Sequence, residues 1–351
     1  MNKQKNIVKG MLWAGTASIS WGVSGTVLQL ISQNLAIPAH WMLSMRTSAA
    51  GAILLIISAI LYRGKIFNVF KSWPSVISLF SYAVFGLMAN LYTFYYAVQT
   101  GNASMATILQ YLSPLFIVFG GWFFQHSRPL KSDLLSFVIA MAGVFLCLTK
   151  GNFGHLAIPL NSFLWGLGSG ITAAFYVVLP QKAAEENSPL VVLGWGTAIA
   201  GVLFNLYQPF WVNPPHITGT LVASVSTVVL FGTIIPFGML MHATKFAPSD
   251  VVSIMDALQP IVTAILSVIF FKEWMNWIEI LGIVLVILAI YILQNGRRKG
   301  HLEQEYDLHY SAVILQNTKS RSVLNLGTDR LFDYIELLTN GWLWLLSWLL
   351  S

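Results

Sequence analysis

Apolar segments long enough to cross a lipid bilayer follow one another along almost all of the first 295 positions of the chain. A membrane-spanning helix needs about 20 mostly apolar residues, and a helix satisfies its own backbone hydrogen bonds inside the bilayer. Only 9% of the residues are charged, whereas soluble domains carry about 25%. We therefore predict an all-α polytopic membrane protein with ten transmembrane helices, at 10–31, 40–62, 75–98, 103–124, 132–149, 160–180, 189–209, 219–242, 249–271 and 277–294.

The basic residues are concentrated in alternate connectors between these helices. Thirteen Lys and Arg residues fall on one side of the ten-helix core, and only Lys150 and Lys272 fall on the other. An excess of Lys and Arg marks cytoplasmic loops, so we expect both ends of the core to be cytoplasmic. The net charge of +6 is therefore explained by the orientation of the helices in the membrane. Because it forms no basic face, we expect the lipid bilayer as a partner and no nucleic acid.

The second half of the core repeats the first. At an offset of 146 positions, Gly86 aligns with Gly232 and Pro114 aligns with Pro260. Each half contains five predicted helices, and because five is odd the second half has to enter the membrane in the opposite orientation. Inverted repeats of this kind are typical of transporters, with a binding site near the membrane midplane. We expect a cytoplasmic N-terminus, two five-helix repeats, and a cytoplasmic tail with an interfacial end, at 1–9, 10–149, 150–296 and 297–351.

Several short motifs resemble a known family. They are LeuTrpAlaGly at 12–15, TyrTyrAla at 95–97, LeuSerProLeu at 112–115, LeuGlnProIle at 258–261 and PheLysGluTrp at 271–274. With the repeat, they make the chain similar to bacterial EamA-type members of the drug/metabolite transporter superfamily. The resemblance implies a carrier of small organic metabolites in the plasma membrane, often an exporter of amino acids or related compounds. The first repeat departs from the family pattern, because it has Gln125 and His126 where such repeats commonly carry a glutamate like Glu273.

A polar stripe follows one face of the predicted helix 249–271. Its members recur at spacings of three and four, which place them on one side of a helix. A carboxylate inside a membrane has to face a cavity or a protein partner. We therefore expect Asp256 to bind a cationic group or a coupling proton. The alternative is an acid satisfied by neighbouring hydroxyls or by Arg46. The stripe consists of Ser253, Asp256, Gln259, Pro260, Thr263 and Ser267.

Residues on other helices and the two repeat-related prolines extend the candidate site. Gln110 is the repeat counterpart of Asp256 and has Tyr111 beside it; it could contact solute or join helices by hydrogen bonds. Arg46 could pair with Asp256, bind a substrate carboxylate, or reach outward to the membrane surface. Pro114 and Pro260 interrupt backbone hydrogen bonding at mid-depth, which favours a gating role over a passive kink.

Aromatic and amide side chains in the first and third helices complete the candidate set. Trp21, Asn90 and Tyr92 could line the cavity, or could serve packing alone. We predict that substrate is bound by Asp256, Gln110, Trp21, Gln259, Tyr111, Asn90, Tyr92 and Arg46, and that Pro114 and Pro260 act in gating.

The histidines show no metal-ligand spacing, and the nucleophile, phosphate-loop and zinc-protease motifs are all missing from the sequence. We expect no enzyme activity, cofactor or metal. The favoured function is a secondary transporter that moves an amino acid, amine or drug-like solute by alternating access, with export favoured. The alternative is an intramembrane enzyme or lipid-handling subunit. The coupling ion, which could be a proton, and a homodimeric state stay open.

Overall fold

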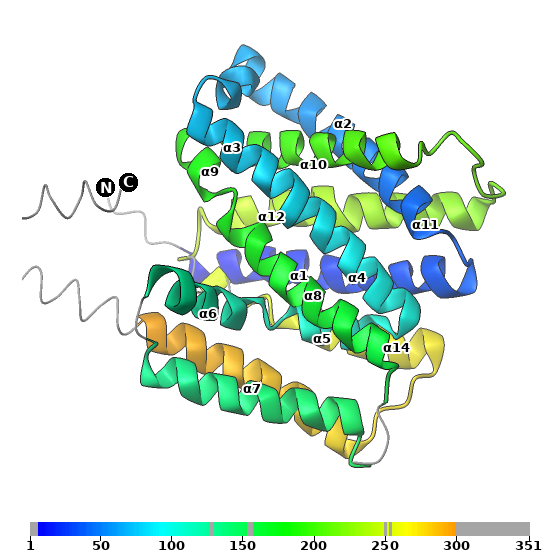
Figure 1. The fold of residues 1–351 in the computed structure, drawn as a ribbon, viewed down its shortest axis with the longest axis vertical. Helices are drawn as coiled ribbons and strands as arrows, with labels where there is room; N and C mark the ends of the chain where they lie inside the picture. The colour runs from blue at the N-terminus through cyan, green and yellow to red at the C-terminus, as the bar shows by residue number, and fades with distance from the viewer. Residues whose placement is uncertain (1–5, 127–128, 153–156, 249–250, 253–254, 299–351) are drawn as a thin grey trace, which may run out of the picture. The chain divides into compact units, whose positions relative to one another are not determined.

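The computed structural model describes residues 6–126, 129–152, 157–248, 251–252 and 255–298 (Figure 1). Among these residues the regular elements are helices, and no strand occurs. Eight helices in this part of the chain are long and apolar enough to cross a membrane. They are Ala39–Phe70, Trp73–Thr100, Ala103–Phe124, Lys131–Thr149, Leu160–Glu186, Pro189–Tyr207, Gly219–Ala243 and Trp277–Arg298.

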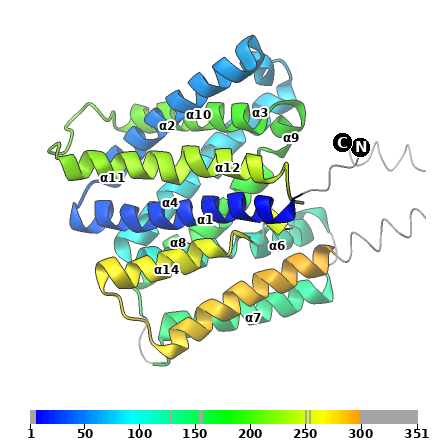
Figure 2. The same ribbon diagram turned by 180° about the vertical axis from the view of Figure 1, so that it is seen from behind.

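Two of the ten predicted spans are not among these eight. The first predicted span corresponds to α1 (Ile7–Gln29), which is rich in Ser and Gly and has twelve buried residues. Helix α1 lies between α12 (Ile235–Ala243) and α14 (Leu258–Phe271), as Figures 1 and 2 both show. The second is the predicted span 249–271, of which α14 is the apolar part. Helix α1 needs less apolar surface because much of it faces other helices. Helix α14 is apolar, and it is not among the eight because it has only 14 residues.

The remaining helices are shorter than the apolar segments because several spans contain irregular turns. Helices α3 and α4 are joined by a π-helical turn at Tyr82–Met88, and α11 and α12 by another at Leu230–Ile234. Such π-helical turns inside longer helices often mark functional sites. The labelled helices are α2 (Ala39–Tyr62), α3 (Trp73–Ser81), α4 (Ala89–Thr100), α5 (Ala103–Gln110), α6 (Ser113–Gln125), α7 (Lys131–Thr149), α8 (Leu160–Val178), α9 (Gln181–Glu186), α10 (Pro189–Tyr207) and α11 (Gly219–Val229).

Two prolines lie just after interruptions in membrane helices. Helix α5 ends at Gln110, and α6 begins three residues later with Pro114 in its first turn. Asp256 likewise lies in a turn directly before α14, which contains Pro260. Proline has no backbone N–H, so it leaves the carbonyl four residues earlier without its helical donor. Those carbonyls belong to Gln110 and Asp256, which explains why both helices are interrupted at these residues.

Helix α7 and the helix Trp277–Arg298 approach each other through glycines. A Cβ atom added at Gly143 would lie 2.7 Å from the carbonyl oxygen of Gly282, so the two backbones are in contact. At the far end of the pair, Arg297 Nη2 binds the buried carboxylate of Asp133 at 2.9 Å. These contacts hold the two helices side by side (Figure 1).

Replacing Gly143 with Leu is expected to lower the melting temperature of the detergent-solubilised protein. The new side chain would have to displace the backbone of the neighbouring helix, and overpacking of this kind costs about 1–3 kcal/mol. Thermal unfolding followed by circular dichroism measures the effect. Gly120→Leu is the matched control, because a Cβ atom at Gly120 meets no atom within 4 Å. Equal melting temperatures for the two variants would contradict the close crossing.

Candidate functional site

A cavity of about 390 Å³ lies inside the helical bundle. Residues from both halves of the chain line it. They belong to helices α1, α2, α4, α5, α6, α8, α10, α12 and α14, to the helix Trp277–Arg298, to the π-helical turns Tyr82–Met88 and Leu230–Ile234, and to the turns after α5 and before α14. The cavity brings together seven of the eight residues predicted to bind substrate, together with one of the two prolines. These lining residues are Asp256, Gln110, Trp21, Gln259, Tyr111, Asn90, Arg46 and Pro114.

Two predicted residues lie elsewhere. The ring of Tyr92 lies 4.7 Å from that of Tyr96 and 5.9 Å from that of Trp165, in an aromatic cluster outside the cavity lining. Pro260 is buried within α14 and does not line the cavity either. The stripe residues Thr263 and Ser267 are completely buried in the bundle, and Ser253 falls outside the described residues.

Asp256 reaches the cavity from the turn before α14. Its Oδ1 accepts a hydrogen bond from the hydroxyl of Ser18 in α1 at 3.2 Å. No ion pair joins Asp256 to Arg46 in the part of the chain that the structure describes. The acid therefore has one neutral donor and a cavity beside it, which leaves room for a further cationic or protic partner.

Arg46 lies on the wall formed by α2, and its side chain points into the bundle instead of toward the membrane surface. The residue is 8% exposed. Its Nη2 donates to the carbonyl of Gly232 at 3.3 Å and to Thr233 Oγ1 at 3.4 Å. The carbonyl of Gly232 is available because Pro236, four residues later, has no N–H to donate.

The guanidinium of Arg46 is only partly satisfied by these contacts. Its Nε is buried and has no hydrogen-bond partner among the described residues. A guanidinium carries five N–H donors in a planar fork that matches a carboxylate. The side chain thus lines the cavity and has an N–H donor that is not engaged in a hydrogen bond.

Gln110 and Asn90 form a hydrogen-bonded network between helices. Gln110 Nε2 donates to Asn90 Oδ1 at 3.3 Å and to Ser169 Oγ at 3.1 Å. Asn90 Nδ2 in turn donates to the carbonyl of Ser169 at 3.0 Å. These bonds join α4, α5 and α8, so the two amides hold the cavity wall in place as well as line it.

Several lining residues are not in the predicted set. Thr233 contacts Arg46, and Phe237 packs edge-on against Trp21 with ring centroids 6.1 Å apart. Tyr176 and Gln294 also line the cavity. Pro236 is the sequence signal for Thr233, because this proline leaves the carbonyl of the neighbouring residue Gly232 without a helical donor. Gln294 sits at the end of an otherwise apolar helix, and no spacing rule singles it out.

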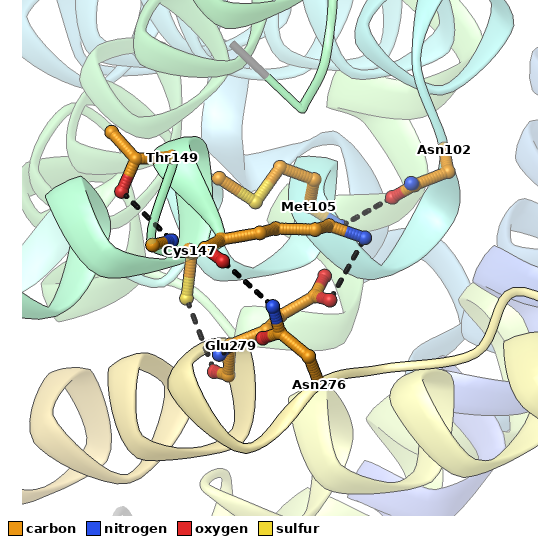
Figure 3. Close-up of polar contacts among 8 residues, drawn as sticks. Asn102, Met105, Cys147, Thr149, Asn276 and Glu279 are labelled. Atoms are coloured by element: carbon orange, nitrogen blue, oxygen red, sulfur yellow. Dashed lines mark hydrogen bonds and ion pairs between the residues drawn. The ribbon is translucent and has the colours of Figure 1, made fainter. Parts of the chain in front are cut away.

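A second polar cluster lies where α7 ends and the helix Trp277–Arg298 begins (Figure 3). Lys150 Nζ pairs with Glu279 at 2.8 Å, and Asn276 Nδ2 donates to the carbonyl of Lys150 at 2.7 Å. Cys147 Sγ lies 3.6 Å from the carbonyl oxygen of Glu279. Within the described ranges, no group of three or more His, Cys, Asp or Glu side chains could hold a metal ion. The cluster is therefore a structural tie between two helices.

Membrane-length helices around a cavity that both halves of the chain line are the arrangement found in secondary transporters. The chain belongs to the EamA-like transporter family, whose model matches residues 8–149 and 160–294. It is accordingly a membrane transporter of small solutes and not an enzyme. The family resemblance seen in the sequence motifs is thereby confirmed.

Two curated relatives and one solved structure are similar to the chain. An uncharacterized inner membrane transporter, YicL of Salmonella typhimurium, is 28% identical over 296 residues, which cover 83% of this chain and 97% of YicL. The threonine/homoserine exporter RhtA of Escherichia coli is 25% identical over 219 residues, 62% of this chain and 71% of RhtA. A crystal structure with 18% sequence identity covers 83% of this chain and 98% of its own, with a TM-score of 0.57, and supports the fold alone.

Proposed function

We propose that this protein is a secondary transporter that moves a small zwitterionic or cationic organic solute by alternating access, and that the cavity is its solute site. The observation that carries the proposal is the presence of Arg46 and Asp256 on one cavity, with no ion pair between them among the described residues. Arg46 suits a carboxylate, and Asp256 suits an ammonium group. Export of an amino acid, as the name of RhtA states for that relative, fits the same pair of charges.

The proposal includes ten membrane crossings in two inverted repeats, 10–149 and 150–296, in a bacterial inner membrane. Both halves contain a π-helical turn followed by a helix interrupted just before a proline, Pro114 or Pro260. Interrupted helices at the interface of two repeats are characteristic of secondary transporters. The distribution of Lys and Arg supports a cytoplasmic position for both ends of the core.

A coupling proton would act at Asp256 in this scheme. A carboxyl group that holds a proton cannot also neutralise a solute ammonium group, so proton and solute would occupy the site in turn. Such competition at one carboxyl group produces exchange of proton against solute when only the carrier that holds one of the two ligands changes its orientation.

Solute flux into proteoliposomes tests the proposed function. The purified protein is first screened by thermal shift against amino acids and amines, because a bound ligand stabilises the folded carrier in proportion to its occupancy. Solutes that raise the melting temperature are then supplied in radiolabelled form. We expect saturable, time-dependent uptake that liposomes without protein do not show. Stabilisation by a solute that is never transported would favour a binding role instead.

A further inference from the structure

A hydrogen-bonded contact ties three helices together at the end of the bundle opposite to the N-terminus of α1. Gln29, the last residue of α1, donates from Nε2 to Oε1 of Glu273 at 2.6 Å. Its Oε1 accepts the backbone N–H of Ala103, the first residue of α5, at 2.7 Å. One amide therefore joins the ends of α1 and α14 to the start of α5. We name Gln29, Ala103 and Glu273 the outer latch.

The outer latch lies over the cavity. Gly25 and Leu28 line the cavity from the turn of α1 that precedes Gln29. Gln29 itself is 1% exposed. Gln33, one turn further on, donates to the carbonyls of Val98 at 2.8 Å and Gly101 at 2.7 Å. These bonds hold the π-helical turn that follows α1 (Leu30–Asn34) against the end of α4, next to the cavity residues Gly25 and Leu28.

The carboxyl group of Glu273 is only half satisfied in the latch. Its Oε1 accepts from Gln29, but its buried Oε2 has no hydrogen-bond partner among the described residues. Burial raises the pKa of Glu273; the bond from Gln29 and the charge of Lys150 lower it, and the charge of Glu279 raises it. Lys150 is already paired with Glu279 at 2.8 Å. A neutral hydroxyl without an acceptor costs less here than a buried charge without a counter-ion of its own.

We propose that Glu273 is a proton-binding gate residue, whose neutral form keeps the outer latch closed and whose ionised, hydrated form opens it. The inference rests on the proposed transport function, because a latch over a cavity matters only if solute leaves past it. With the proposed topology, this end of the bundle faces the outside of the cell.

The sign of the pH dependence follows from the burial of Glu273. A carboxyl group whose pKa is raised in the closed state binds a proton more tightly there, so protonation stabilises the closed state. The closed fraction is therefore largest at low pH and falls as the pH rises through the raised pKa of Glu273. External protons close the outer end, and their removal opens it.

A single reporter cysteine at the cavity tests the gate. Cys147 is the only cysteine in the sequence, so Cys147→Ala gives a cysteine-free background. Gly25→Cys then places a thiol below the latch, where an added Cβ atom has no neighbour closer than 3.9 Å. The measured quantity is the rate at which a membrane-impermeant maleimide, applied to the outside of intact cells without solute, modifies this thiol. The expected rate rises between about pH 5 and about pH 8.

Variants of the latch separate its closure from its titration. Glu273→Gln keeps an acceptor for Gln29 and cannot ionise, so the latch stays closed at every pH. The remaining rise of its modification rate with pH comes from ionisation of the reporter thiol. Dividing the parent rate by the rate of this variant therefore removes the contribution of the thiol. Glu273→Ala and Gln29→Ala break the bond, and we expect modification up to about tenfold faster at low pH, the upper end of the factor for one lost hydrogen bond between neutral groups.

Lys272→Asn is the matched control. It removes a charge next to Glu273 without touching the latch, and Asn tolerates the left-handed backbone at this position (φ 56°). Its modification should follow the parent protein at every pH. The proposal is overturned if Glu273→Ala is modified at the parent rate, or if Glu273→Gln keeps the full pH dependence. Because the assay contains no solute, a failure of solute flux would refute the transport function and leave the gate result standing.

Discussion

Replacing Arg46 with Gln is expected to reduce transport of a carboxylate-bearing solute by about 100-fold. The fork of Arg46 lines the cavity with its Nε unused, and each hydrogen bond between charged groups contributes about 1.5–3 kcal/mol. Arg46→Lys keeps the charge and loses the fork, so we expect a smaller loss of about tenfold. The measurement is the initial rate of uptake into proteoliposomes at subsaturating solute.

A comparison of two solutes separates binding from folding in this experiment. The decarboxylated amine of the same amino acid has no group for Arg46 to bind, so its uptake should change much less. Both variants also lose the hydrogen bonds of Arg46 to Gly232 and Thr233. If the role of Arg46 were structural, this loss would reduce the uptake of both solutes by the same factor. Equal losses for the amino acid and its amine would therefore contradict carboxylate binding.

Replacing Asp256 with Asn is expected to abolish most uptake of cationic and zwitterionic solutes, with a loss of about 100-fold in the initial rate. Asn has the same shape as Asp, and its amide oxygen can still accept the hydrogen bond from the hydroxyl of Ser18. We therefore expect the variant to keep the fold. The charge that attracts an ammonium group is gone, and so is the group that could exchange a proton. The remaining uptake should no longer depend on pH through this site.

Glu185→Gln is the control for Asp256→Asn. Glu185 forms an exposed pair with Lys182 at 3.1 Å, and exposed pairs contribute little to stability. Uptake by this variant should equal that of the parent. If Asp256→Asn transports at the parent rate with the parent pH profile, Asp256 has no part in the solute site.

The membrane helices and the two interruptions could be predicted from local sequence. The lengths of the apolar runs determine the spans, and a proline leaves the carbonyl four residues before it without its helical donor. Helix α1 shows where hydropathy is insufficient, because its Ser and Gly residues face other helices and not lipid. Two members of the periodic polar stripe, Asp256 and Gln259, line the cavity, whereas Thr263 and Ser267 of the same stripe are buried in the bundle.

The contacts that determine the chemistry of the site could not be predicted in this way. Arg46 binds a carbonyl 186 positions away, and Gln29 meets Glu273 across 244 positions. No periodicity relates residues so distant in the chain. Tyr92 was predicted as a cavity residue from its type and helix, yet the structure orients it toward Trp165. Residue type determines what a side chain can bind, whereas tertiary packing determines whether it faces the cavity.

Counterflow in proteoliposomes tests the central claim most directly, namely that one cavity opens alternately to the two sides of the membrane. Vesicles are loaded with unlabelled solute and diluted into a trace of the same solute in labelled form. A carrier that returns loaded from each side accumulates label transiently above its equilibrium level, and we predict this overshoot for the parent protein and its loss in Asp256→Asn. Monotonic equilibration without an overshoot would contradict alternating access.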